Sequence, residues 1–440
     1  INNKSNFVKK DLTLLWEERE MNYQKIKHNN YHIHVINNQK FHNIIFAIYF
    51  TQNINEDDFA YHNVLVDILT TACKKYDTRS KIVKRTQDLY SINPYATTFR
   101  CGNLLITKFA ISILNSKYLE ENIVQDNILL IKELLLNPLV ENGKFNDKYF
   151  ELSINDEMKK TERLKERLIP YINNQAIKNS SDNKENYQIS KYISIDKLKS
   201  ISNKKLYQKY LEMFHNSKID FFLAGNMNNS NELVEFIQKE FVFDNQYQLN
   251  NTFVKHFNKP RKIKELKEKM NIEQSKLSVI IKAFNTSDFE MKNVSVIYNS
   301  LLGGDSNSFL NTVVREENGF AYSMYSFYDK PDNLFIINGG FSKNNYYKII
   351  DIINTSISLI EQGKFTKKRL EISKKNLIND LLNYDESNSS LVNFYFGIEI
   401  FHGKDVKERI KEVKKITKED VINYAKKLKI TTIYNLESDL

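Results

Sequence analysis

The sequence predicts an α+β protein of two tandem, homologous α/β sandwich domains, each with a mainly antiparallel sheet and helices packed on one face. Two repeated motifs and a recurring order of elements predict this fold. DFAYHNVLV (58–66) returns as DFEMKNVSV (288–296), and GKFNDKYFELS (143–153) returns as GKFTKKRLEIS (363–373). The offsets are 230 residues (288 − 58) and 220 residues (363 − 143), so the two matches indicate an internal duplication of about 220 residues.

Each copy begins with an apolar strand, at 41–50 and 276–284, and continues through a polar turn into the shared helix. A second helix and two strands follow: 79–90, 94–101 and 104–114 in the first copy, and 306–318, 320–329 and 333–341 in the second. Short polar turns between the strands favour antiparallel pairing. Long amphipathic helices at 122–137 and 346–362 then cover one face of each sheet.

The domain boundaries follow from the repeat. An apolar strand at 218–227 resembles the last strand of a first domain, which we assign to residues 1–245. Residues 246–270 are polar and then basic around Pro260, which is typical of a linker. The second domain is assigned to residues 271–440.

Composition excludes several classes of function. The net charge of +10 comes from 64 basic and 54 acidic residues that alternate along helices, which is typical of solvated helix faces and not of nucleic-acid binding. Two cysteines provide no disulfide framework and suit a reducing cytosol. Neither a signal peptide nor a stretch of roughly 20 apolar residues is evident, so we expect a cytoplasmic protein without a membrane span.

The residues offer few candidates for chemistry. Among the eight histidines, His32 and His34 face one side of a strand, but no third ligand lies at a recognisable spacing, which favours ordinary strand histidines. Arg315 ends a helix and Tyr322 opens the following strand, so a tight corner brings guanidinium and phenol to one edge. The same residues also fit a cation favoured at a helix C-terminus and a tyrosine packed in a strand.

The segment LLGGDSNSFLNTVVREENGFAYSMYS (301–326) resembles the C-terminal domain of the insulinase/pitrilysin metallopeptidases, which include mitochondrial processing peptidase. In that family an Arg and a Tyr seven positions apart form a substrate-binding pair, and Arg315 and Tyr322 keep this spacing. The family also has the duplicated domain, which forms half of a clam-shell. The resemblance spans essentially the whole chain.

The resemblance implies that the first-domain helix is a former zinc site. Active members carry His-x-x-Glu-His shortly before a Gly-Thr-Lys-Lys-like turn, and anchoring on Lys74-Lys75 places this motif on NVLVD (63–67). Asn63, Val66 and Asp67 then replace both histidines and the glutamate that activates water. Asparagine and valine cannot hold a catalytic zinc, so we expect this chain to bind no metal.

The third zinc ligand of the family is a Glu in an acid-rich helix. The corresponding stretch here is ELSINDEMKK (151–160), with Lys159-Lys160 near the ligand position. Glu151 and Glu157 lie close by in the sequence, so the alignment of this ligand stays open by a residue or so.

The resemblance further implies a non-catalytic, substrate-binding subunit of a heterodimeric zinc metallopeptidase that cleaves extended peptides. Zinc is then expected in a paralogous partner subunit, with Arg315 gripping the peptide and Tyr322 donating to the scissile carbonyl or its oxyanion. Two alternatives stay open: a structural subunit like the core subunits of respiratory complexes, and a peptide-binding escort with no proteolytic role.

Overall fold

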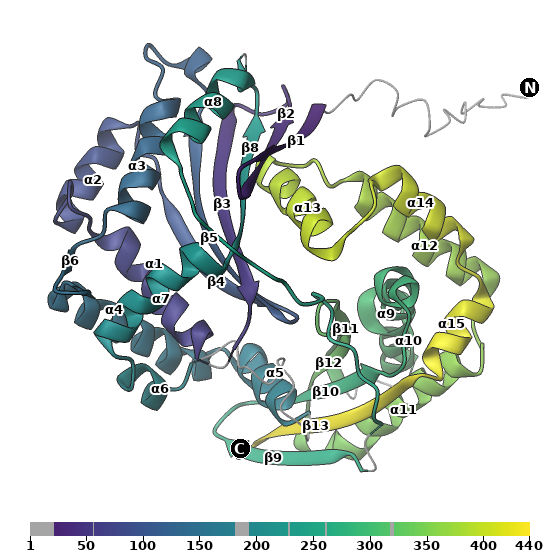
Figure 1. The fold of residues 1–440 in the computed structure, drawn as a ribbon. Helices are drawn as coiled ribbons and strands as arrows, with labels where there is room; N and C mark the ends of the chain where they lie inside the picture. The colour runs from purple at the N-terminus through teal and green to yellow at the C-terminus, as the bar shows by residue number, and fades with distance from the viewer. Residues whose placement is uncertain (1–21, 56, 181–192, 228, 260–261, 317–320) are drawn as a thin grey trace, which may run out of the picture.

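Two mixed sheets, each with its own layer of helices, form the molecule (Figure 1). The computed structural model describes residues 22–55, 57–180, 193–227, 229–259, 262–316 and 321–440. The first sheet has the order β1-β2-β8-β3-β5-β4, with β1 (Asn22–His28), β2 (Tyr31–Asn37), β3 (Asn43–Asn53), β4 (Tyr95–Cys101), β5 (Leu104–Leu114) and β8 (Lys218–Gly225). The second has the order β11-β12-β10-β13-β9, with β9 (Lys264–Met270), β10 (Ser275–Ala283), β11 (Ala321–Asp329), β12 (Leu334–Phe341) and β13 (Leu428–Ser438).

Strand pairing in the described ranges is antiparallel, except that β2 pairs with β8 and β9 pairs with β13 in parallel. The fold class predicted from the sequence is therefore confirmed. The strands predicted at 41–50, 104–114 and 276–284 form β3, β5 and β10. The hairpin β1–β2, which the sequence analysis did not assign, extends the first sheet beyond β8.

The helices follow the predicted order in both halves. The first half contains α1 (Asp58–Thr71), α2 (Arg79–Asp88), α3 (Val124–Leu136), α4 (Asp147–Glu162), α5 (Leu168–Asn179), α6 (Ile195–Lys199), α7 (Asn203–Asn216) and α8 (Ser230–Glu240). The second half contains the π-helical segment η4 (Glu290–Val294), α9 (Ser295–Asn299), the π-helical η5 (Ser300–Gly304), α10 (Phe309–Glu316), α11 (Tyr346–Glu361), α12 (Lys367–Leu382), α13 (Asn388–Phe401), α14 (Val406–Lys415) and α15 (Lys418–Ala425). None of the described helices combines the length and apolar character that crossing a membrane requires.

The central strand β3 is buried on both faces, which explains its unbroken apolar run. Successive side chains of a strand point to opposite sides of the sheet. Ile44, Phe46, Ile48 and Phe50 of β3 pack into the core beneath the helices of the first half. Ile45, Ala47 and Tyr49 pack into a second cluster that includes Phe396 of α13. A continuous apolar strand is the pattern expected for a sheet covered on both sides.

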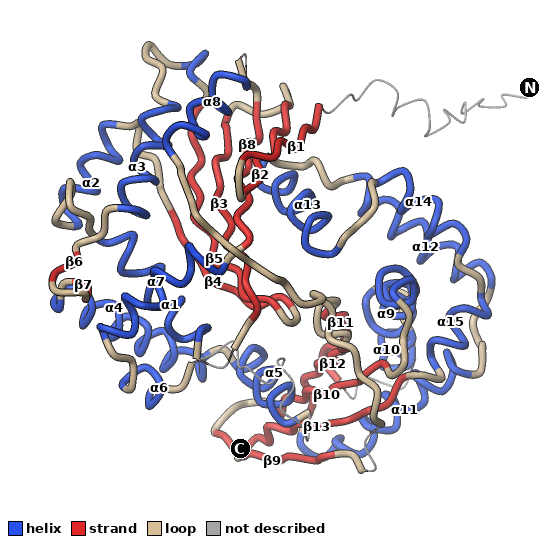
Figure 2. Tube along the Cα trace, in the orientation of Figure 1, coloured by secondary structure: helices blue, strands red, loops and turns tan. Residues whose placement is uncertain are grey.

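One helix from each half packs on the sheet of the other half. Figure 2 shows α13 of the second half against the first sheet and α5 of the first half against the second sheet. The ring of Phe396 in α13 stacks on Tyr49 of β3 with 3.9 Å between centroids. In the opposite direction, Asn173 Oδ1 of α5 accepts hydrogen bonds from Ser278 Oγ at 2.7 Å and Asn338 Nδ2 at 2.6 Å. Helices therefore cover both faces of each sheet, whereas the sequence analysis expected helices on one face only.

The segment between the two halves is partly structural. The sequence predicts a linker at 246–270, and the structure places β9 at the end of that segment, where it forms one edge of the second sheet. Asn103 N donates to the Thr252 carbonyl at 3.0 Å, so the preceding stretch packs against the turn between β4 and β5. These contacts tie the connection to both sheets.

A buried ion pair joins the two halves where β4 ends. Arg100 Nη1 donates to Asp332 Oδ1 at 2.7 Å, and both side chains are almost completely buried. Gly102 follows in the left-handed region with a φ of +59°, and a Cβ there would lie 1.8 Å from the Thr252 carbonyl oxygen. Only glycine allows the chain to pass so close at this conformation.

Candidate functional site

The helix predicted to be a former zinc site is α1, which packs against α4. Asn63 Nδ2 donates to the Phe59 carbonyl of its own helix at 2.7 Å. Val66 is buried and presents only an apolar surface. Neither side chain offers the imidazole or carboxylate that a zinc ion requires.

The third position, Asp67, faces an ammonium group. Lys160 Nζ of α4 lies 3.8 Å from an Asp67 oxygen and donates to Glu157 Oε1 at 2.5 Å. Lys159, by contrast, pairs with Asp156 on a more exposed side of the helix. The sequence analysis considered several residues of α4 for the third-ligand position. Of these, Glu157 and Lys160 are the two that lie near Asp67. The Lys160 ammonium group thus lies between the Asp67 and Glu157 carboxylates.

The pKa shifts follow from this shared cation. Burial raises the pKa of Glu157, because the hydrogen bond from Lys160 only partly offsets desolvation and the nearby Asp67 and Asp156 charges add to it. Burial by itself would lower the pKa of Lys160, but Glu157 and Asp67 hold it above its ordinary value. Lys160 therefore stays protonated at neutral pH and neutralises the charge that would attract a metal ion.

The residues present do not fit a catalytic zinc. Within the described ranges, no group of three or more His, Cys, Asp or Glu side chains is placed to hold a metal ion. His62, next to Asn63, is fully buried, with Nδ1 2.8 Å from Thr107 Oγ1 and Nε2 3.2 Å from Gln52 Nε2. Burial lowers the pKa of His62 to about 3, so this ring is a neutral core residue.

The pair His32 and His34 belongs to a buried charge network. His34 Nε2 lies 3.1 Å from Asp220 Oδ1, and its Nδ1 lies 2.9 Å from the Tyr23 hydroxyl. Lys218 Nζ donates to Asp220 Oδ2 at 2.9 Å. Both ring nitrogens of His34 are engaged and an ammonium already binds the carboxylate, which agrees with the structural interpretation of these histidines.

The same network reaches the second half of the chain. Lys218 and Lys25 bind Glu399 of α13 at 2.5 and 2.7 Å. Burial alone would raise the pKa of Glu399, but the Lys218 and Lys25 ammonium groups outweigh it and hold this pKa below its ordinary value. The ionised carboxylate therefore helps to dock α13 on the first sheet.

The predicted substrate-binding pair lies where α10 leads into β11. The backbone places Arg315 in the last turn of α10 and Tyr322 second in β11. Residues 317–320 between them, and the side chains of residues 314–323, lie outside what the structure describes. The geometry of the Arg315 and Tyr322 side chains thus stays a prediction from the sequence.

Two edge strands carry exposed aromatic side chains. Among the described strands, β4 ends the first sheet and β11 ends the second, so each has one row of backbone groups with no described strand beside it. Tyr95 of β4 is 39% exposed, and Tyr325 and Phe327 of β11 are 40% and 38% exposed. An extended peptide can add to such an edge through its main chain and use the aromatic surfaces for its side chains.

Two tandem α/β sandwiches are the fold that the resemblance to the insulinase/pitrilysin metallopeptidases implies. Residues 200–377 match the family model described as the Peptidase M16 inactive domain. A relative described as a probable inactive metalloprotease, YmfF of Bacillus subtilis, is 21% identical over 95% of this chain and 98% of its own length. The chain is therefore a homologue of the insulinase-type M16 metallopeptidases and resembles their inactive members.

Solved structures agree in fold. A conserved protein from Enterococcus faecalis superimposes with a TM-score of 0.85 at 20% identity, covering 95% of this chain and 99% of that one. A structure described as the peptidase M16 inactive domain from Pseudomonas fluorescens superimposes with a TM-score of 0.73 at 13% identity, covering 96% of this chain and 99% of that one. Both similarities extend over the two sheets and their helices.

Proposed function

We propose that this chain is the non-catalytic, substrate-binding subunit of a heterodimeric zinc metallopeptidase that cleaves extended peptides. The observation that carries the proposal is the metal position on α1, where Asn63 and Val66 offer neither imidazole nor carboxylate and Lys160 lies beside Asp67. A chain with this helix needs a second, zinc-bearing paralogue for hydrolysis.

The Arg315 and Tyr322 pair gives such a chain a role in the reaction. Zinc-assisted attack on a peptide bond develops negative charge on the carbonyl oxygen, and a donor aimed at that oxygen stabilises the transition state. In the proposal, Tyr322 supplies that donor across the heterodimer interface and Arg315 orients the peptide. The exposed edge of β11, which begins beside Tyr322, supports a peptide bound in an extended conformation.

The test uses a partner with an intact His-x-x-Glu-His motif and a fluorogenic peptide. We expect no cleavage by either subunit alone, and cleavage that a chelator inhibits when the two are mixed. Tyr322→Phe and Arg315→Ala in this chain should each lower kcat/KM about 100- to 1,000-fold. Tyr347→Phe, which removes the hydroxyl of an exposed tyrosine on α11, and Arg79→Ala on the exposed α2 are matched controls that should leave the rate unchanged.

The outcomes separate the proposal from its alternatives. A stable complex whose activity is insensitive to Tyr322→Phe and Arg315→Ala assigns a scaffold role. Peptide affinity without any protease partner assigns an escort role. Chelator-sensitive cleavage by this chain alone, with stoichiometric zinc after dialysis, contradicts the non-catalytic assignment altogether.

A further inference from the structure

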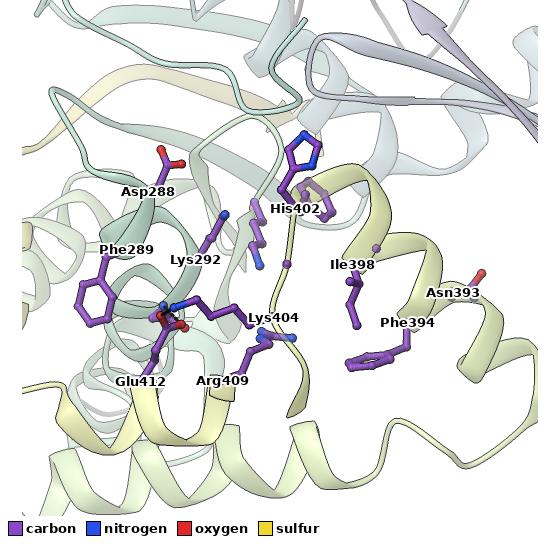
Figure 3. Close-up of a pocket in the computed structure, with 15 residues that line it drawn as sticks. Asp288, Phe289, Lys292, Asn393, Phe394, Ile398, His402, Lys404, Arg409 and Glu412 are labelled. Atoms are coloured by element: carbon purple, nitrogen blue, oxygen red, sulfur yellow. Dashed lines mark hydrogen bonds and ion pairs between the residues drawn. The ribbon is translucent and has the colours of Figure 1, made fainter. Parts of the chain in front are cut away.

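A cavity of about 390 Å³ lies within the second half of the chain, between η4, α13, the turn after α13, and α14 (Figure 3). One wall of this cavity is formed by α13, the helix of the second half that also packs on β3 and β8 of the first sheet. Its lining combines basic groups on one side with an apolar surface on α13. No residue of the proposed peptidase site lines it.

Three cations in the lining form no ion pair within the part of the chain that the structure describes. Lys330, Arg409 and Lys292 are partly buried, and none of them pairs with a carboxylate of the described residues. The two acids of the lining are already neutralised: Asp288 pairs with Lys255 at 3.1 Å, and Glu412 pairs with Lys404 at 2.5 Å.

Desolvation makes this arrangement costly without a counterion. Burial, together with the nearby charges of Arg409 and Lys292, lowers the pKa of Lys330 to about 8. Burial also lowers the pKa of Arg409, against the opposing effect of Glu412. The Lys330 ammonium lies over the Phe401 ring, 5.5 Å from its centroid, which replaces only part of its hydration. An anion bound here would relieve the mutual repulsion of all three cations.

The opposite wall of the cavity, on α13, is apolar and leaves space for a ligand. Phe394 and Ile398 project from α13 toward the basic side of the cavity in Figure 3. Gly397 lies between them in the helix interior, where glycine is disfavoured. A Cβ built on Gly397 meets no atom within 4 Å, so the missing side chain leaves open space in the wall.

We propose that this cavity binds a compact organic anion, with its carboxylate or phosphate head held by Lys330, Arg409 and Lys292 and its apolar body against Phe394, Gly397 and Ile398. Guanidinium and ammonium donors are the groups that bind such heads most strongly. The head can belong to a free small molecule or, if it is a carboxylate, to the C-terminus of a peptide. This site does not depend on the heterodimer proposed above.

The experiment titrates the full chain, without a partner, in a calorimeter. The probes are N-acetylphenylalanine and phenyl phosphate, with N-acetylphenylalanine amide as the uncharged control. We expect saturable binding of at least one anion and at least about tenfold weaker binding of the amide. A peptide with a free C-terminal phenylalanine that displaces the small anion identifies a peptide terminus as the source; failure to displace it identifies a free small molecule.

Variants locate the binding. Gly397→Phe fills the wall, and Lys330→Met keeps the aliphatic stem but removes the charge; each should weaken binding at least about tenfold. Gly397→Ala is the matched control and should bind like the wild type. Circular dichroism and melting temperature confirm folding, and Lys330→Met is expected to melt no lower than wild type because it removes a partly desolvated charge that forms no ion pair within the described residues.

The pH dependence provides a second readout. Lys330 faces Arg409, Lys292 and Cys101, and its protonated form binds the anion. N-acetylphenylalanine keeps its charge above pH 7, so its affinity should fall as pH rises through about 8, and Lys330→Met should lose this dependence. Failure of both anions to bind saturably up to about 10 mM, or equal binding by Gly397→Phe, Lys330→Met and wild type, overturns the proposal.

Discussion

Replacement of Asp332 by alanine tests how strongly the two halves of the chain are joined. Arg100 and Asp332 are 2% and 1% exposed in their side chains, and Arg100 Nη1 donates to Asp332 Oδ1 at 2.7 Å. Removing one partner of a buried pair costs about 3–5 kcal/mol because the remaining charge stays buried. Arg100 Nη1 keeps its hydrogen bond to the Gly102 carbonyl at 2.9 Å, so we expect a loss of about 3 kcal/mol, the lower end of this range.

Scanning calorimetry measures the effect. At about 2.1 cal/mol/K per residue, a cooperative unit of 440 residues has an unfolding entropy of about 0.9 kcal/mol/K, so the melting temperature should fall by about 3 °C. If the two halves melt separately, the same loss acts on a smaller unit and the shift is larger. Asp77→Ala breaks an exposed pair with Lys81 and is the matched control, expected within about 0.5 kcal/mol of wild type. An Asp332→Ala protein that melts like this control would refute the reasoning.

Three further substitutions test the packing and the charges of the fold. Gly102→Ala should lower the free energy of unfolding by about 2 kcal/mol or more in a urea titration, because its Cβ would lie 1.8 Å from a backbone carbonyl oxygen. Gly143→Ala, at a φ of +70° with open space around it, should cost only the backbone strain of about 1 kcal/mol; equal losses would exclude the close contact as the cause. The pKa of Glu399 is lowered on folding, so its stabilisation is fully present above its unfolded pKa of about 4.3 and is lost as pH falls from there through its lower folded pKa. Glu399→Gln should therefore destabilise by about 1–2 kcal/mol at pH 7 and by less at pH 3, and a loss that is independent of pH would argue against an ionic role. Lys160→Met should raise the pKa of Glu157 further and destabilise the chain by up to about 1 kcal/mol at neutral pH, less at pH 4, as measured by thermal melting; unchanged stability at pH 7 would mean that the cation between α1 and α4 contributes nothing.

Local sequence patterns predicted most elements of the fold. The repeated motifs fixed the order of helices and strands in both halves, because amphipathic periodicity depends on neighbours within one element. The strand at 41–50 was predicted correctly. Its unbroken apolar run also indicates burial on both faces of the sheet, whereas the sequence analysis predicted helices on one face only. The helices α5 and α13 supply the second cover, and each comes from the other half of the chain.

The candidate sites differ in how much of each could be predicted from local sequence. The resemblance assigned Asn63, Val66 and Asp67, because the metal motif of the family has a fixed spacing on one helix. The position of Lys160 between Asp67 and Glu157 required the packing of α4 on α1. The basic cavity had no sequence signal, because its three cations come from separate elements and follow no motif.

The sequence by itself determined the duplication, the order of elements and the absence of the His-x-x-Glu-His side chains, since these depend on residue identity and short-range spacing. Tertiary structure alone decided which helix covers which sheet face, which ammonium lies beside Asp67 and which cations share a cavity without a counterion. Such relations depend on burial and on contacts between segments far apart in the chain, which hydrophobic periodicity does not encode.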